Sequence, residues 1–318
     1  MSRGLPGKPI SRINSTYGAH RSVQAPIAVG VDGSDAGYLA VHWAAETAAQ
    51  RGQELRILHG LDLDATRAVV GSYDLLIPSV VENLRRRGAH TVQSARAVAL
   101  DVDPALRVAT EVSSDNPSRL LLGAAATACM MVLGASGNRL AGAHFGSTLL
   151  AVTRHAPGVV VVVRGACDES RIRRGGPVVV GVDGSLSSAD VLAAAFEEAS
   201  MRHVELIAVH TWSDVHIGHF AGLAPAAAPN PESDESPCAI LGERLVGWQE
   251  KYPGVVVTTR LYFDGPADRL AELSRAAQLV VVGSRGRGGF TSLLLGSTSS
   301  FLVQHAHCPV MVVHPGSP

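Results

Sequence analysis

The segment PIAVGVDGS at residues 26–34 decides the fold, because it occurs twice in the chain. It returns 151 positions later as PVVVGVDGS at 177–185. Each occurrence is a short apolar run that ends in Asp-Gly-Ser, which is typical of a buried strand followed by a tight turn. Glycines further along keep nearly the same offset, since Gly283 follows Gly134 by 149 positions. A repeat of this period indicates two copies of one structural unit.

The copies are separated by a polar, glycine-bearing segment of the kind that links domains. The basic N-terminal segment contains no acidic residue and no continuous apolar run, so it is not a secretory signal, and we expect a flexible tail. The predicted organisation is a tail at 1–25, a first domain at 26–164, a linker at 165–176 and a second domain at 177–318.

Strand and helix patterns alternate within each copy. Strands are expected near 27–31, 55–60, 107–112, 129–133 and 159–163, and again near 178–182, 204–210, 255–261, 279–283 and 309–313. Helices are expected near 36–51, 79–100, 117–126 and 147–155, and again near 187–201, 237–250, 266–277 and 297–305. This alternation predicts an α/β fold: two tandem doubly wound domains, each with a five-stranded parallel sheet flanked by helices. Such sheets bind ligands beyond the carboxyl ends of their strands. Two long connections, 62–78 and 211–237, are predicted as lids or disordered insertions.

The second copy contains a glycine-rich segment, LVVVGSRGRGGFTSLLLGSTSS at 279–300. A short apolar strand pattern is followed by four glycines and two arginines, and Gly296-Ser297-Thr298 then begins a helix pattern. Glycine allows backbone N–H groups to approach a ligand, and a helix start presents unpaired donors at a positive dipole end. The segment therefore favours a phosphate-binding loop, and a turn that only reverses the chain is the alternative.

An aspartate follows the first strand of each copy, at Asp32 and Asp183. A carboxylate at this end of a strand can accept hydrogen bonds from a ribose hydroxyl or an adenine amino group, which is the role we favour. The preceding glycines, Gly30 and Gly181, would let a nucleotide lie against bare backbone. The alternative is that Asp-Gly-Ser only makes the turn and caps the next helix.

The spacing Gly283-x2-Gly286-x9-Gly296-Ser297, together with the first-strand aspartate, resembles the signature of the ATP-binding branch of the universal stress protein family. The whole chain outside the tail resembles a tandem member of that family. The resemblance implies a Rossmann-like, adenine nucleotide alpha hydrolase-like fold that holds ATP, and it leaves open whether magnesium accompanies the nucleotide. The contacts that it implies in the second copy are Gly181, Asp183, Gly283, Ser284, Arg285, Gly286, Arg287, Gly288, Gly289, Gly296, Ser297 and Thr298. Asp214 could face the ribose or a metal ion, or only solvent.

The first copy departs from this spacing, because its loop has eight residues where the second copy has nine. One residue fewer shifts half of an anion cradle by about 3 Å if the chain is extended. We expect this copy to bind nucleotide more weakly. Its implied contacts are Gly30, Asp32, Gly134, Gly137, Arg139, Gly146, Ser147 and Thr148.

Composition excludes several classes of function. A net charge of −1 and an aromatic content of 4% argue against nucleic acid as a partner. No apolar run is long enough to predict a membrane span. The four cysteines form no CxxC pair, so neither a disulfide framework nor a structural zinc site is expected, and a cytoplasmic location fits best.

The predicted function is a nucleotide-dependent regulatory or stress-response module that binds ATP and is not an enzyme, or hydrolyses ATP only slowly. No Walker A lysine, HExxH or GxSxG motif occurs, and no base and nucleophile converge. The alternatives are a slow metal-dependent ATPase and a dimerising scaffold with a vestigial nucleotide site. The apolar fifth strands, 159–163 and 310–313, are edges that could pair the two copies or two chains, and a homodimer through these edges is expected.

Overall fold

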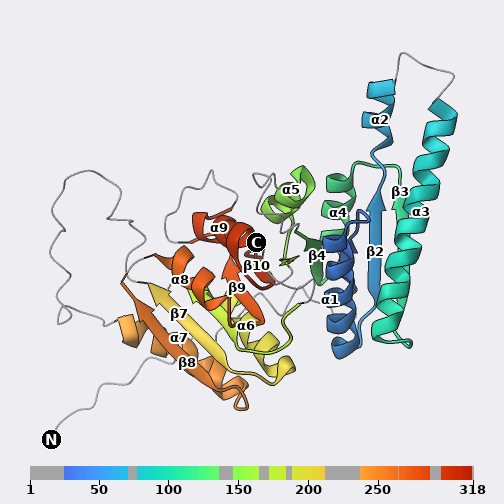
Figure 1. Ribbon diagram of the computed structural model, residues 1–318. Coiled ribbons are helices and arrows are strands. Elements are labelled where there is room, and N and C mark those ends of the chain that lie inside the picture. Colours follow the sequence, from blue (N-terminus) through green and yellow to red (C-terminus); the bar gives the residue numbers. More distant parts are fainter. Residues whose placement is uncertain are drawn as a thin grey trace, which may run out of the picture.

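A computed structural model describes residues 25–70, 77–135, 146–164, 172–183, 188–211, 237–263, 265–286 and 295–316. These residues form one ten-stranded sheet with the order β3-β2-β1-β4-β5-β10-β9-β6-β7-β8. Figure 1 shows the first copy in blue to green and the second in yellow to red, with the fifth strands of the two copies between them. Within each copy all neighbouring strands are parallel, so the predicted five-stranded parallel sheets are confirmed.

The elements of the first copy are β1 (Ile27–Gly30), α1 (Asp35–Arg51), β2 (Leu55–Gly60), α2 (Leu63–Val70), α3 (Ile77–Val102), β3 (Val108–Ser113), α4 (Pro117–Ala125), β4 (Met130–Gly134), α5 (Ser147–His155) and β5 (Val159–Val163). Those of the second are β6 (Val178–Val182), α6 (Ser188–Arg202), β7 (Leu206–Thr211), α7 (Pro237–Lys251), β8 (Val257–Tyr262), α8 (Pro266–Leu273), β9 (Leu279–Gly283), α9 (Ser297–His305) and β10 (Val310–Val313).

Helices cover both faces of the sheet, and each face has a core that runs through both copies. Residues of α1, α3, α6 and α7 pack into one buried apolar cluster with one face of the strands. Residues of α4, α5, α8 and α9 pack into a second cluster on the other face. Because the strands are buried on both sides, they read as nearly continuous runs of valine, leucine and isoleucine. None of the described helices is both long enough and apolar enough to cross a bilayer.

The connection predicted at 62–78 contains structure that the sequence reading missed. Helix α2 occupies 63–70, and α3 begins at Ile77, so that Pro78 lies in its first turn. Proline is tolerated there because the first N–H groups of a helix have no intrahelical partner. Pro78 was therefore wrongly assigned to the connection.

The two copies meet through their fifth strands. β5 and β10 pair antiparallel, with Val162 opposite Val310 and Val159 opposite Val313. Both strands are fully buried, and each has the fourth strand of its own copy on the other side. The expectation of a homodimer through these edges is therefore wrong, because the edges are already paired within one chain. The edges left at the ends of the described sheet belong to β3 and β8.

Residues that directly follow β5 and β10 also join the copies. Arg164, just after β5, donates from Nη1 to the carbonyl of Val303 in α9 at 2.7 Å. His314, just after β10, donates its backbone N–H to Gly158 at 2.8 Å. Burial is the largest of the effects that together lower the pKa of His314 to about 4; a hydrogen bond with the backbone of Thr153 opposes the shift, and the nearby Arg285 and His155 add to it.

We expect His314 to make the junction sensitive to acid. The unfolded chain takes up a proton near its ordinary pKa of about 6.5, whereas the folded ring stays neutral down to about pH 4. Stability is therefore complete above pH 6.5 and is lost as the pH falls from 6.5 to 4, by at most about 3 kcal/mol. Urea denaturation at several pH values should show this slope for the parent protein. In His314→Gln the slope over that window should be shallower, and an unchanged slope would contradict the assignment.

Candidate functional site

In the second copy the first-strand aspartate and the glycine loop lie together at the carboxyl end of the sheet. Asp183 directly follows β6 and is half-buried, and β9, which leads into the loop, pairs with β6. The carboxylate oxygen Oδ2 lies 3.4 Å from the position that a β-carbon on Gly286 would occupy. The contact arises because neighbouring parallel strands end at the same edge.

A serine holds the other carboxylate oxygen. Ser188 is the first residue of α6, and its Oγ donates to Oδ1 of Asp183 at 2.6 Å. The sequence reading missed this residue. The available signal was a difference between the copies, because the position that matches Ser188 at the offset of 151 is Gly37, which has no side chain.

The glycine loop is held against the start of α9. The backbone N–H of Gly296 donates to the carbonyl of Ser284 at 2.7 Å, and the N–H of Ser284 donates to Val313 at 2.8 Å. Ser284 itself is fully buried. A β-carbon on Gly296 would lie 3.8 Å from the nitrogen of Gly286. The two halves of the predicted loop, before and after residues 287–294, are therefore brought together.

The first turn of α9 has no side-chain cap. Gly296 is the N-cap residue, and since glycine has no side chain, the N-cap residue accepts no hydrogen bond from the first-turn N–H groups. Ser297 and Arg285 are exposed beside it, and Thr298 is half-buried. An uncapped helix start carries a partial positive charge, and an arginine adds a full one. This arrangement suits an anion.

The corresponding aspartate in the first copy is arranged differently. Asp32 is exposed, and its Oδ1 accepts hydrogen bonds from the backbone N–H of Ser34 at 2.9 Å and from its hydroxyl at 2.6 Å. Ser34 in turn caps α1 by accepting from the N–H of Gly37 at 3.1 Å. The capping interpretation is therefore confirmed for Ser34. Oδ1 of Asp32 is bound within its own turn.

The first glycine of each loop also differs between the copies. A β-carbon on Gly134 would lie 2.1 Å from the carbonyl oxygen of Ala36, so the backbone at the start of α1 fills that space. The matching position in the second copy, Gly283, is less crowded, with the nearest atom being the carbonyl oxygen of Arg285 at 3.1 Å. Packing alone is enough to require glycine at position 134. At the start of α5, Gly146 is an N-cap without a side-chain hydrogen bond, and Ser147 and Thr148 follow it as in α9.

The glycines within the first strands serve packing. A β-carbon on Gly30 would meet Leu121 and Leu133 at 2.9 Å, and one on Gly181 would meet Leu270 at 2.9 Å. The leucines give a packing reason for glycine at both positions, and contact of a nucleotide with these glycines stays a prediction.

Six predicted contacts lie outside the described residues. They are Gly137, Arg139, Asp214, Arg287, Gly288 and Gly289. Among the residues that are described, no group of three or more His, Cys, Asp or Glu side chains is arranged to hold a metal ion.

The fold and site define a class of proteins with two doubly wound α/β units in tandem, each with an acid after its first strand and a glycine at the end of its fourth. The universal stress protein family matches residues 25–164 and 176–314, and the chain belongs to this family. A universal stress protein from Mycolicibacterium smegmatis is 40% identical over 297 residues, which is 91% of this chain and 97% of that protein.

Solved structures agree on the fold. A universal stress protein from Archaeoglobus fulgidus has a TM-score of 0.67 at 15% identity and covers 92% of this chain and 100% of its own. A universal stress protein in complex with cAMP is 26% identical and covers 44% of this chain and 98% of its own, with a TM-score of 0.35. This last similarity spans less than half of the chain and supports no conclusion about a ligand here.

Proposed function

We propose that the protein binds ATP in its second copy and acts as a nucleotide-dependent regulatory or stress-response module. The observation that carries this proposal is the convergence of three features at one edge of the sheet. These are the carboxylate of Asp183, the backbone at Gly286 and the uncapped start of α9 at Gly296.

Each feature has a distinct role in the proposal. Asp183, held by Ser188 through Oδ1, accepts hydrogen bonds from the ribose or the base. The exposed backbone at Arg285 and Gly286 and the first turn of α9 donate N–H groups to phosphate oxygens. The guanidinium of Arg285 adds positive charge at the mouth. The residues present therefore fit a nucleotide, since an acceptor and several donors lie at one edge of the sheet.

The first copy is proposed as the weaker site. Its loop is one residue shorter, and Oδ1 of Asp32 is engaged by Ser34. The start of α5 is nevertheless uncapped like that of α9, so an anion could still be held there.

The experiment is ATP titration by calorimetry on matched variants of the two copies. Asp183→Asn keeps the shape of the side chain and an acceptor for Ser188 but removes the charge. Since a hydrogen bond to a charged group contributes about 1.5–3 kcal/mol, we expect the second-copy affinity to fall about 10- to 100-fold. Asp32→Asn should change the dissociation constant of the tighter ATP-binding event by less than about threefold.

Other outcomes would redirect the assignment. Absence of ATP binding by the parent protein, both as purified and after removal of any bound nucleotide by denaturation and refolding, would refute the proposal and favour the scaffold. Multiple-turnover hydrolysis that is abolished in Asp183→Asn would favour the slow ATPase. Equal losses in the two matched variants would contradict the ranking of the two sites.

A further inference from the structure

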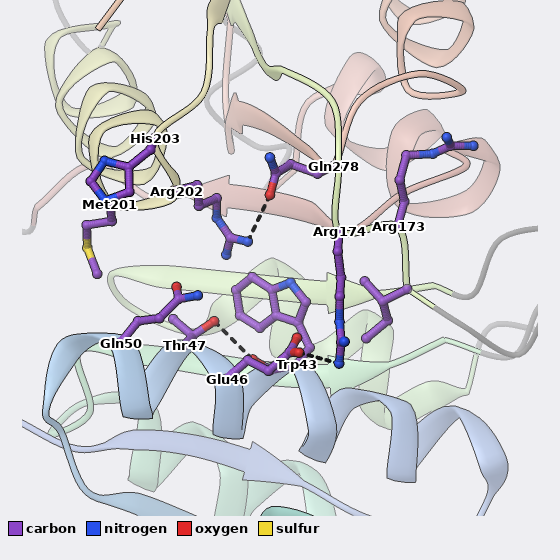
Figure 2. A pocket seen from close by; sticks show the side chains of 11 residues that line it. Trp43, Glu46, Thr47, Gln50, Arg173, Arg174, Met201, Arg202, His203 and Gln278 are labelled. Carbon is purple, nitrogen blue, oxygen red and sulfur yellow. Dashed lines mark hydrogen bonds and ion pairs between the residues drawn. The ribbon is translucent and has the colours of Figure 1, made fainter. Parts of the chain in front are cut away.

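A cavity lies between the two copies, away from the carboxyl edge described above. Its volume is about 240 Å³. Side chains of α1 form one wall, residues 172–174 form another, and the end of α6 with Gln278, just before β9, forms the third (Figure 2). Ligand sites commonly measure about 300–1,000 Å³. This cavity therefore suits a compact molecule, smaller than a nucleotide.

One wall holds a guanidinium in a fixed orientation. Arg202 donates from Nε to Glu198 at 2.9 Å and from Nη1 to Gln278 at 3.3 Å, and it lies 5.3 Å above the ring of Trp43. Figure 2 shows this guanidinium between Gln278 and Trp43. Nη2 of Arg202 has no hydrogen-bond partner among the described residues. An arginine that is already ordered loses little entropy when it donates to a further acceptor.

The other charged side chains of the lining either pair with each other or point away from the cavity. Among the described residues, Glu46 is the one acidic residue of the lining, and it is paired with Arg174. Arg173 is exposed, and its guanidinium points away from Arg202 and Trp43 (Figure 2). The lining thus combines the guanidinium of Arg202 with amide donors such as Gln50. This combination favours an oxyanion.

A histidine occupies a strained position at the same cavity. His203 follows α6 with φ of 54°, in the left-handed region that favours glycine. The matching residue of the first copy is Gly52, which ends α1 with φ of 62°. Histidine at this position costs stability relative to glycine. The imidazole of His203 lines the cavity, which gives the second copy a donor that the first copy lacks.

We propose that the cavity between the copies binds a compact phosphate-bearing anion, which accepts hydrogen bonds from Arg202 and His203. This site is separate from the glycine loop, and the proposal does not depend on ATP binding there.

The probe is inorganic phosphate, titrated at constant ionic strength against chloride, with acetate as a second comparison. The readout is the indole N–H signal of Trp43, identified by its loss in Trp43→Phe. We expect phosphate to shift this signal saturably, and acetate to shift it less. Chloride at matched ionic strength should leave it unchanged.

The decisive variant is His203→Gly, which introduces the glycine that the first copy has at the matching position. It should weaken phosphate binding about tenfold while its thermal midpoint stays equal to or above that of the parent protein. The matched control is Gly52→His, where an added β-carbon has no neighbour within 4 Å. This variant should lower the thermal midpoint and leave phosphate binding unchanged.

Gly286→Ala, in the glycine loop, should leave the Trp43 response intact. The proposal is overturned if the parent signal does not respond to phosphate, if His203→Gly binds phosphate normally, or if Gly286→Ala removes the response.

Discussion

Glu198→Ala is expected to lower the free energy of unfolding by about 3–5 kcal/mol, because it removes a buried acceptor that two largely buried arginine side chains share. Glu198 of α6 is paired with Arg51 of α1, in the other copy, and accepts from Nε of Arg202 at 2.9 Å. The side chains of Glu198 and Arg51 are only 3% and 7% exposed. A charge that loses its partner in such a setting keeps its desolvation cost without compensation.

The measurement is urea denaturation, with the slope of the transition recorded as well as its midpoint. Glu197→Ala is the matched control, since Glu197 also pairs with Arg51, at 2.9 Å, but is 32% exposed. Because partly exposed pairs are screened by water, we expect a loss of about 1 kcal/mol or less from this control. Equal losses of unfolding free energy for the two variants would show that burial does not set the strength of these ion pairs.

Gly134→Ala should destabilise the protein by about 3 kcal/mol, near the upper end of the usual cost of overpacking. The new β-carbon would stand 2.1 Å from the carbonyl oxygen of Ala36 and 2.8 Å from the nitrogen of Gly37. Both atoms belong to the backbone and cannot turn away as a side chain can. The start of α1 must therefore move away from β4.

Gly283→Ala is the corresponding change in the second copy. The nearest atoms there are the carbonyl oxygen of Arg285 at 3.1 Å and a methyl of Val191 at 3.3 Å, so shifts of a few tenths of an ångström suffice. We expect a loss of about 1 kcal/mol or less, measured by the same denaturation experiment. A larger loss of unfolding free energy for Gly283→Ala than for Gly134→Ala would contradict this difference in packing between the copies.

Much of the fold could be predicted because its causes are local. The repeated apolar runs specify buried strands, and the alternating helices require right-handed crossovers, so the parallel order within each copy follows. The rule that ligands bind beyond the carboxyl ends of strands also predicted that Asp183 and the glycine loop would meet. Helix α2 was missed because it has only eight residues, and a helix this short depends on tertiary packing more than on local propensity.

The amino-acid sequence by itself determined the duplication, the five parallel strands of each copy and the presence of an acid and a glycine loop at one edge. Only the tertiary structure decided that β5 pairs with β10 within one chain, since an apolar edge does not specify its partner. It also decided that leucines fill the space beside Gly30 and Gly181, that Ser188 holds Asp183, and that a cavity opens between the copies. These features depend on contacts between residues far apart in the chain, which no local pattern encodes.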